Sequence, residues 1–290
     1  MTHPAHDNQP ADVRTQPPEA YWEDRESGIA LYHGDMREVL PALDVQADLV
    51  LADPPYGETS LAWDRWPDGW LALAARHTRS MWCFGSQRMF FRHLDEFEVA
   101  GWRLSQDVVG LDEDGQPIVG DVNVVWEKNT GSSRATDRFR RVHEHALHWY
   151  RGGGWRDEIH HDVPRVKALP EETGHTREGH VVRAIPVPHT GMYQPKPWVD
   201  DGTRLMRSVI RVRNLRGRAI HPTEKPVDLL DPLIRYACPP GGLVIDPFAG
   251  SGSTLDAARQ SGRRAAGIEG REAYCAAAAR RLSQLTLEAS

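Results

Sequence analysis

Four consecutive residues, Asp53-Pro54-Pro55-Tyr56, combine a carboxylate, two prolines and an aromatic ring. Proline fixes φ and supplies no N–H, so the backbone here is stiff and its carbonyl oxygens are not used by a continuing strand. A carboxylate and a carbonyl can accept hydrogen bonds from an amino group, and an aromatic face can stack on a planar base. The tetrapeptide is therefore a candidate site for a base with an amino group. The alternative is a rigid turn with Tyr56 packed in the core.

A second stretch that could hold a ligand is the glycine-rich segment Asp246-Pro247-Phe248-Ala249-Gly250-Ser251-Gly252-Ser253-Thr254. It follows residues 243–245, an apolar run that predicts a buried strand, and it opens a predicted helix. Glycines let the backbone approach a ligand, and a helix N-terminus presents free N–H groups to an anion such as a carboxylate. Glu269 ends the next predicted strand, residues 264–268, where its carboxylate could pair with the two hydroxyls of a ribose.

Two common nucleotide-binding motifs do not fit this segment. A dinucleotide-binding fingerprint would have a third glycine near Leu255, and a Walker phosphate loop would have a lysine between the last glycine and Ser253. Both residues are absent. The segment therefore indicates a ligand that differs from those bound by these two motifs.

The net charge of −6 hides an asymmetry along the chain. Between Lys128 and Arg218 there are 18 Lys and Arg but 10 Asp and Glu, so this stretch carries +8 and the remainder −14. Its last fifteen residues contain no acid but six arginines, namely Arg204, Arg207, Arg211, Arg213, Arg216 and Arg218. Arginine forks suit phosphate groups and guanine edges, so we predict a face that binds DNA. A solvated charged face is the alternative.

The run His143-Glu144-His145-Ala146-Leu147-His148 contains three histidines that a metal ion could use. A zinc protease needs histidines four residues apart on a helix, with glutamate next to the first, and this spacing does not provide them. As a strand, the run places Glu144, Ala146 and His148 on one face by alternation. We therefore expect structural roles for these residues and no metal ion.

The segments between these motifs alternate between predicted strands and helices. Strands are predicted at residues 28–32, 48–52, 80–84 and 121–126, and helices at residues 36–43, 70–78, 86–99 and 271–285. This alternation is typical of an α/β fold with a doubly wound, mostly parallel sheet, which binds its ligands at the carboxyl ends of the strands. Asp35 follows the first strand, where it can cap the next helix or bind a ligand amine. A loop at residues 57–69 carries Trp63 and Trp66, which could cover the site or seal its edge by packing.

Four parts of the chain differ in composition. Residues 1–27 are rich in Pro, Asp, Glu and Gln and are expected to be a disordered tail. Residues 28–129 and 220–290 carry the regular alternation, whereas residues 130–219 form a predicted insertion with repeated Gly, Pro, Arg and His.

The start lacks an apolar signal-peptide core, no run approaches 18 apolar residues, and the three cysteines are unsuited to disulfides or structural zinc. We expect a soluble cytoplasmic protein.

Taken together, the tetrapeptide at Asp53 and the glycine motif at Asp246 resemble those of the amino-group DNA methyltransferases that use S-adenosylmethionine. Their order in the chain resembles the circularly permuted beta group of that family. Three shorter segments are also similar to segments of this group: His33-Gly34-Asp35, Trp126-Glu127-Lys128 and His221-Pro222-Thr223-Glu224-Lys225-Pro226. The resemblance implies a catalytic half at residues 28–129, a target recognition insertion at 130–219 and a cofactor-binding half at 220–290.

The resemblance also implies roles for individual residues. The methionine part of S-adenosylmethionine would lie among five residues of the glycine motif, namely Asp246, Phe248, Gly250, Gly252 and Thr254. Ala249 and Ser253 of the same motif would also bind the cofactor. Its carboxylate would be held by Thr223 and Lys225, its ribose by Glu269 and its adenine amino group by Asp35. The catalytic site would consist of Asp53, Pro54, Pro55 and Tyr56. There, Asp53 and the Pro54 carbonyl would bind the target amino group and Tyr56 would stack on the base. The six arginines would bind DNA.

The chemistry of an exocyclic amino group suits these residues. Such a group is a poor nucleophile, because its lone pair is delocalised into the ring. Two acceptors aimed at its N–H bonds would favour the pyramidal form, in which the lone pair points at the methyl group. A base inside a duplex must be flipped out to reach such a pocket. We therefore expect site-specific methyl transfer to double-stranded DNA.

The identity of the methylated base rests on Asp53. An aspartate at the first position of the tetrapeptide resembles the adenine-N6 enzymes more than the cytosine-N4 enzymes, in which serine is common, so adenine N6 is the preferred target. Cytosine N4 is the main alternative. Methylation of RNA or protein amino groups, or DNA binding with a catalytically silent site, is less favoured. A homodimer and a cognate restriction enzyme are further partners that the resemblance allows, and no membrane partner is expected.

Overall fold

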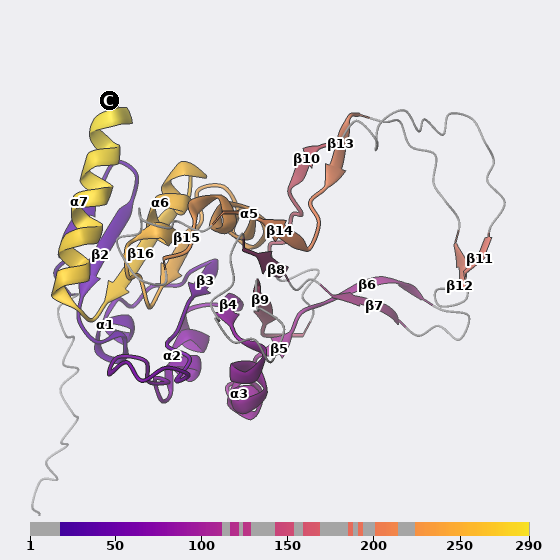
Figure 1. Ribbon diagram of the computed structural model, residues 1–290, viewed down its shortest axis with the longest axis horizontal. Helices are drawn as coiled ribbons and strands as arrows, with labels where there is room; N and C mark the ends of the chain where they lie inside the picture. Colours follow the sequence, from indigo (N-terminus) through magenta and orange to yellow (C-terminus); the bar gives the residue numbers. More distant parts are fainter. Residues whose placement is uncertain are drawn as a thin grey trace, which may run out of the picture.

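The computed structural model describes residues 18–111, 117–121, 124–128, 143–153, 159–168, 185–187, 191–193, 201–213 and 224–289. A ten-stranded sheet lies at its centre (Figure 1). In spatial order its strands are β1 (Trp22–Asp24), β2 (Ile29–His33), β16 (Arg264–Glu269), β15 (Leu243–Asp246), β3 (Leu49–Ala52), β4 (Ser80–Gly85), β9 (His143–Tyr150), β8 (Val124–Glu127) and β14 (Val209–Arg211), with β5 (Arg103–Leu104) paired to β9.

Strand directions make this sheet mostly parallel. The five strands from β2 to β4 pair in parallel, while β9 runs antiparallel to both β4 and β8, and β14 is parallel to β8. The strand β15, near the end of the chain, lies between β16 and β3, so the two sequence motifs lie on neighbouring strands. The predicted mostly parallel α/β sheet is confirmed.

Helices cover both faces of the sheet (Figure 1). One face carries α1 (Met36–Ala42), α2 (Trp70–His77) and α3 (Gln87–Val99), and the other carries α5 (Val227–Ala237), α6 (Ser253–Gln260) and α7 (Glu272–Ala289). Because side chains alternate along a strand, the two faces bury different residues of the same strand. In β3, Leu49 and Leu51 belong to the core under α5–α7, whereas Val50 belongs to the core under α1–α3.

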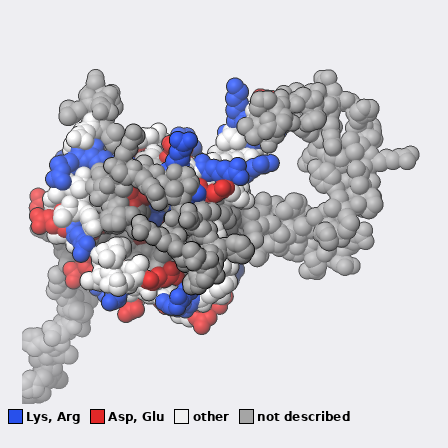
Figure 2. All heavy atoms as spheres, viewed as in Figure 1, with Lys and Arg blue, Asp and Glu red and all other residues white. Residues whose placement is uncertain are grey.

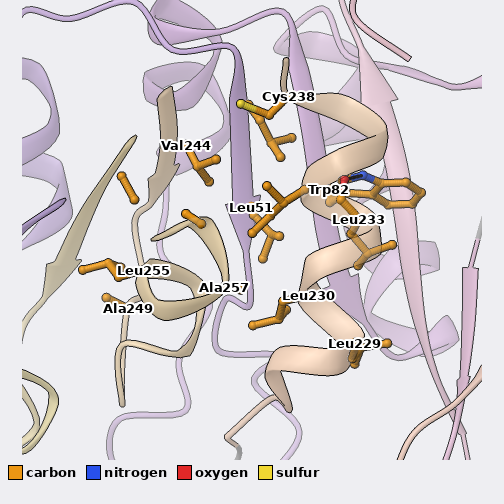
Figure 3. Packing of buried hydrophobic residues seen from close by; sticks show 14 of the residues in the cluster. Leu51, Trp82, Leu229, Leu230, Leu233, Cys238, Val244, Ala249, Leu255 and Ala257 are labelled. Carbon is orange, nitrogen blue, oxygen red and sulfur yellow. Dashed lines mark hydrogen bonds between the residues drawn. The ribbon is translucent and has the colours of Figure 1, made fainter. Parts of the chain in front are cut away.

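The core under α5 shows why an apolar run such as residues 49–52 becomes a central strand. Leu51 of β3 and Trp82 of β4 point toward Leu229, Leu230 and Leu233 of α5 (Figure 3). Full burial of a leucine side chain stabilises the fold by about 1.5–3 kcal/mol. Trp82 also donates a hydrogen bond from Nε1 to the carbonyl of Leu233 at 3.0 Å, so its polar atom is satisfied inside the core.

Three two-stranded sheets lie outside the central sheet. They pair β6 (Gln106–Leu111) with β7 (Pro117–Asp121), β10 (Arg165–Lys167) with β13 (Thr203–Leu205), and β11 (Ile185–Val187) with β12 (Gly191–Tyr193). Figure 1 shows β10 and β13 on one side of the molecule, beyond β14. Within the described part of the chain, no helix is both long and apolar enough to cross a membrane.

Two predicted boundaries need correction. Trp22–Asp24 lies in the predicted tail of residues 1–27, yet it forms β1, since it completes the sheet edge by antiparallel pairing with β2. The predicted insertion at residues 130–219 also contributes to the central sheet. Its strand β9 lies between β4 and β8, and β14 extends the far edge, because both strands bury apolar side chains there, such as Ala146 and Ile210.

Candidate active site

A cavity of about 1090 Å³ opens where β3 and β15 end. These strands pair in parallel, so Asp53, which follows β3, and Asp246, the last residue of β15, reach the same edge of the sheet. Ligands bind at this edge in doubly wound folds. The cavity brings together most of the predicted site residues, namely Asp35, Asp53, Pro54, Pro55, Tyr56, Lys225, Asp246, Phe248, Ala249, Gly250, Ser253, Thr254 and Glu269.

The tetrapeptide holds its own carboxylate in place. The Tyr56 hydroxyl donates a 2.7 Å hydrogen bond to Oδ1 of Asp53, so the ring and the carboxylate are fixed relative to each other. Burial, together with the charge of Asp53, raises the pKa of Tyr56 well above its ordinary value. Tyr56 therefore stays a neutral donor at working pH, and Asp53 is its acceptor.

The loop after the tetrapeptide is clamped by one buried carboxylate. Asp64 accepts hydrogen bonds from the backbone N–H groups of Gly57 at 2.8 Å, Glu58 at 3.0 Å and Thr59 at 2.6 Å. Burial alone would raise the pKa of Asp64, but a hydrogen bond from the Thr59 side chain, together with these backbone hydrogen bonds, lowers it below its ordinary value. Asp64 thus fixes the chain immediately after Tyr56.

Trp66 closes the far side of the same loop by packing. Its ring stacks on His93 at 4.0 Å between ring centroids, and its Nε1 donates to Glu96 at 2.8 Å. His93 and Glu96 belong to α3, whose first turn is capped by the Ser86 hydroxyl through the N–H of Met89. The structure thus supports the edge-packing alternative for Trp66.

Lys225 lies on the catalytic side of the cavity. Its ammonium contacts Oδ2 of Asp53, lies 3.5 Å from Oε2 of Glu144, and sits 5.0 Å from the centre of the Phe84 ring. Burial alone would lower the pKa of Lys225, but the two carboxylates raise it, so the side chain is charged. The ammonium of Lys225 thus contacts two carboxylates of the protein, and its assignment to the methionine carboxylate stays a prediction.

The position of Lys225 is fixed by the residue before it. Glu224 accepts a 2.7 Å hydrogen bond from Nη1 of Arg281, and the same Nη1 donates to the hydroxyl of Ser253 at 3.0 Å. Arg281 belongs to α7 and Ser253 to α6. The segment that carries Lys225 is therefore tied to the start of the helix in the glycine motif.

The glycine motif is connected to the next strand by Glu269. One oxygen of this carboxylate accepts the N–H of Gly250 at 2.9 Å and the other accepts the N–H of Arg271 at 2.7 Å. Burial raises the pKa of Glu269 above its ordinary value, although these two hydrogen bonds oppose the shift. Gly250 has a φ of +51°, in the left-handed region where a side chain would be strained.

Asp246 is the most strongly perturbed acid of the cavity. Burial raises its pKa to about 7, although hydrogen bonds from the Thr254 side chain and the Phe248 N–H favour the ionised form. The charges of Asp53 and Glu269 add to the upward shift. A cationic ligand would remove this repulsion, so Asp246 indicates a place for positive charge.

Gly252 lies outside the cavity lining, unlike its neighbours in the motif. With a φ of +77° it is the N-cap of α6, and a Cβ atom there would lie 3.2 Å from Ala278 of α7. Gly252 thus begins the helix and lets α7 approach, and its predicted contact with the cofactor stays a prediction. Asp35 caps α1 through the N–H of Arg37 at 2.9 Å, and it also lines the cavity, so both alternatives for Asp35 are compatible with its position.

Two charged residues of the cavity were missed by the sequence analysis. Glu144 of β9 and Lys128, which follows β8, form a half-buried ion pair beside Lys225. Burial would raise the pKa of Glu144, but Lys225 and Lys128 lower it. The signal for Glu144 was available, since alternation put this carboxylate on the same strand face as the apolar Ala146.

Four of the six predicted DNA-binding arginines belong to the described residues, and none of these four lines the cavity. Arg204 is in β13 and Arg211 in β14, where its Nε donates to Glu127 at 2.7 Å, and both Arg207 and Arg213 are exposed. Figure 2 shows Lys and Arg side chains at the arm formed by β10 and β13, and mixed charges over the rest of this face. Arg216, Arg218 and Thr223 lie outside the described residues.

Among the residues that are described, no group of three or more His, Cys, Asp or Glu side chains is placed to hold a metal ion.

The chain matches a family model, and its curated relatives include two that we describe here. A family model for N6/N4 methyltransferases, described as DNA methylase, matches residues 47–280. The chain is 27% identical over 289 residues to the type II methyltransferase M.ScaI of Streptomyces caespitosus, a match that covers 95% of this chain and 88% of that protein. It is 57% identical over 67 residues to the putative methylase YubD of Escherichia coli strain K12; this match covers 23% of the chain and only 30% of YubD.

Solved structures show the same fold. The M1.HpyAVI–SAM complex superposes with a TM-score of 0.56 and 21% identity, covering 87% of this chain and 98% of that one. The PvuII DNA methyltransferase, described as cytosine-N4-specific, superposes with a TM-score of 0.58 and 15% identity, covering 88% and 86%. The predicted methyltransferase type of sheet is therefore confirmed, whereas its circular permutation stays a prediction.

Proposed function

The chain belongs to the N6/N4 DNA methylase family, and we propose that it transfers a methyl group from S-adenosylmethionine to the exocyclic amino group of a base flipped out of double-stranded DNA, with adenine N6 as the target. The observation that carries the proposal is the shared cavity. The tetrapeptide with Asp53 and the glycine motif with Asp246 line it together, although 193 positions separate them in the printed sequence. Donor and acceptor would thus meet at the ends of neighbouring strands.

The cavity has the groups that this cofactor requires. Its methionine part carries an ammonium and a sulfonium, and the perturbed Asp246 carboxyl would be relieved by such positive charge. Glu269 is held by two backbone N–H groups yet keeps lone pairs for ribose hydroxyls. The bound cofactor would supply an electrophilic methyl group. The chain would supply the binding site and the orientation.

The catalytic residues would act on the amino group. Asp53 and the Pro54 carbonyl would accept its two N–H bonds and turn its lone pair toward the methyl group. Tyr56 would stack on the flipped base, and base–aromatic stacking contributes about 1–3 kcal/mol. In-line positioning of the two reactants supplies much of the rate, so no covalent enzyme intermediate is needed.

DNA would lie along the part of the chain that carries the arginines. Arg207, Arg211 and Arg213 are exposed, and the strand β14 that contains Arg211 borders β8, which leads to Lys128 in the cavity. We expect Arg207→Gln and Arg213→Gln to weaken binding for all DNA sequences alike. Each should lower the slope of log K against log salt by about 0.9, the value for one phosphate contact.

Tritium transfer tests the reaction class. Labelled S-adenosylmethionine is incubated in parallel with DNA, RNA and protein, and label is expected in DNA alone. Asp53→Asn keeps the size of the side chain but removes one acceptor and the charge, so it should abolish transfer while calorimetry still detects cofactor binding. Near wild-type transfer by Asp53→Asn and Asp53→Ala would contradict the mechanism.

Mass spectrometry of the nucleosides tests the base. We expect N6-methyladenine, because Asp53 begins the tetrapeptide. If N4-methylcytosine alone is detected, the target is cytosine N4 instead of adenine N6, and the reaction class is unchanged. Single-molecule sequencing of DNA from a methylation-free host that expresses the gene would give the recognition sequence.

A further inference from the structure

Charges alternate along a row of buried and half-buried side chains beside the tetrapeptide. The row runs from Asp53 to Lys225, then to Glu144 and to Lys128. Its members come from four different places in the fold, namely the end of β3, the segment before α5, β9 and the end of β8. Only 7% of the Lys225 side chain and 16% of the Glu144 side chain is exposed, so these charges depend on one another for stabilisation.

Lys225 is shared between two carboxylates. Its ammonium contacts Oδ2 of Asp53 and lies 3.5 Å from Oε2 of Glu144. The other oxygen of Glu144 is taken by Lys128, whereas Oε2 is buried and makes no hydrogen bond within the described part of the chain. An unmade hydrogen bond on a buried carboxylate is costly, and an ammonium has three N–H donors. A small shift of the Lys225 side chain toward Glu144 would satisfy that oxygen.

In contrast to Glu144, Asp53 has a partner for each of its two oxygens. Oδ1 accepts from the Tyr56 hydroxyl and Oδ2 contacts the ammonium of Lys225. Each carboxylate oxygen has two lone pairs, so a target amino group that binds Oδ2 would share this oxygen with the ammonium of Lys225. The ammonium is the stronger competitor, since its positive charge attracts the carboxylate in a way that a neutral amino group does not.

On the basis of the proposed methyl transfer, we propose that Glu144 is a positioning residue that acts through Lys225: it draws the ammonium away from Asp53, which leaves an oxygen of Asp53 available to the target amino group. Glu144 can do this because it is fixed in the middle of the sheet, on a strand paired on both sides. Lys225 can respond with its side chain alone, because Arg281 holds the neighbouring Glu224. The lowered pKa of Glu144 and the raised pKa of Lys225 keep both groups charged.

A double-mutant cycle on kcat tests this proposal. Glu144→Gln removes the competing charge, so Lys225 should settle on Asp53 and kcat should fall about 10-fold or more, which corresponds to about 1.4 kcal/mol or more. In a Lys225→Met background there is no ammonium to redirect, so Glu144→Gln should cause no further fall. The cofactor Kd of Glu144→Gln, measured by calorimetry, should stay within about 2-fold of wild type, a difference of about 0.4 kcal/mol.

A matched control is Glu23→Gln, which breaks a surface ion pair with Arg25 far along the sheet and should leave kcat unchanged. An equal fall in kcat from Glu144→Gln in both backgrounds would overturn the proposal, and so would no fall at all or a parallel rise in the cofactor Kd. If Glu144→Gln does not fold, the same cycle is run with Glu144→Asp, which keeps the charge but retracts it. If the wild-type protein transfers no methyl group to DNA, the proposed function is wrong. This outcome differs from those that contradict only the role of Glu144.

Discussion

The Tyr56 hydroxyl donates its hydrogen to Oδ1 of Asp53 over 2.7 Å, within a single tetrapeptide. The bond joins the aromatic ring proposed to stack on the base to the carboxylate proposed to bind its amino group. It also uses an acceptor of Asp53 that the amino group would need. The two proposed functions of Tyr56, stacking and holding Asp53, can therefore be separated by mutation.

Tyr56→Phe should lower kcat/KM about 10-fold, because it removes one hydrogen bond to a carboxylate, worth about 1.5–3 kcal/mol, but keeps the ring. Tyr56→Ala should lower it on the order of 10²-fold, since it also removes stacking worth about 1–3 kcal/mol. Steady-state kinetics with a DNA duplex measure both. Equal losses for Phe and Ala would mean that the hydroxyl, and not the ring, is what matters.

Asp64→Ala should lower both stability and kcat. It leaves three backbone N–H groups without the carboxylate that accepts them at present, and hydrogen bonds to charged groups contribute about 1.5–3 kcal/mol each. The loop after Tyr56 would then lose its anchor. We expect a loss on the order of 3 kcal/mol in the free energy of unfolding, measured by urea denaturation, with cofactor affinity nearly unchanged.

The pH dependence of the same residue gives a second readout. Because the folded-state pKa of Asp64 is lowered, its stabilising contribution is complete above the ordinary value of 3.8 and is lost as pH falls through the lower, folded-state pKa. Asp64→Asn should remove this acid-dependent part. If the mutant protein still lost stability over that range to the same extent as wild type, Asp64 would not be the group that titrates.

The parts of the site that could be predicted lie next to local signals. Asp53 and Asp246 each follow a short apolar strand, and the sequence alone places both at strand ends. Lys225 and Asp53 are 172 residues apart, and their contact depends on how α5 packs against the sheet. Glu144 enters the site only because β9 pairs between β4 and β8, and no local pattern specifies strand partners.

The misplaced boundaries have a similar cause. Trp22–Asp24 is short and polar, so its composition resembles the tail before it, and its order comes from backbone pairing with β2. The strands β9 and β14 lie within a Gly- and Arg-rich stretch, so their local composition suggested an insertion. Tertiary pairing determined the outcome in both places, as it commonly does for strands.

Cofactor affinity should increase with pH through neutrality because of Asp246. Burial raises the pKa of this carboxyl to about 7, so below pH 7 the empty site is mostly protonated there. A bound cation favours the ionised form, and binding then requires loss of a proton. The association constant should fall by up to about 10-fold per pH unit below the pKa, since one pKa unit is about 1.36 kcal/mol.

Calorimetry of S-adenosylmethionine binding from pH 6 to pH 8 measures this dependence, with Asp246→Asn as the control that should flatten it. The stability of the protein without cofactor should change with pH in the opposite direction and decrease as pH rises. A folded-state pKa above the ordinary 3.8 means that the contribution of Asp246 to stability is lost as pH rises from about 4 to about 7. A flat affinity profile in wild type would show that Asp246 does not ionise on binding.

His148 should make the protein sensitive to mild acid. It is fully buried in β9, its Nε2 lies 2.9 Å from the hydroxyl of Ser80, and burial lowers its pKa to about 3. The unfolded chain binds a proton at His148 below pH 6.5 that the folded protein does not. This contribution to stability is therefore complete above 6.5 and is lost as pH falls toward 3, by about 1.4 kcal/mol per pH unit.

Urea denaturation gives the free energy of unfolding at pH 7 and at pH 5. The difference between these two free energies should be smaller by about 2 kcal/mol in His148→Gln than in wild type, because pH 5 lies about 1.5 pH units below 6.5. His160→Gln, at a half-buried histidine outside the central sheet, is the matched control. The replacement at 148 lowers stability at pH 7, since glutamine fills the core less well beside Trp82 and Tyr236. The decisive quantity is therefore the pH difference within each variant. Equal differences in wild type and His148→Gln would place the acid-sensitive group elsewhere.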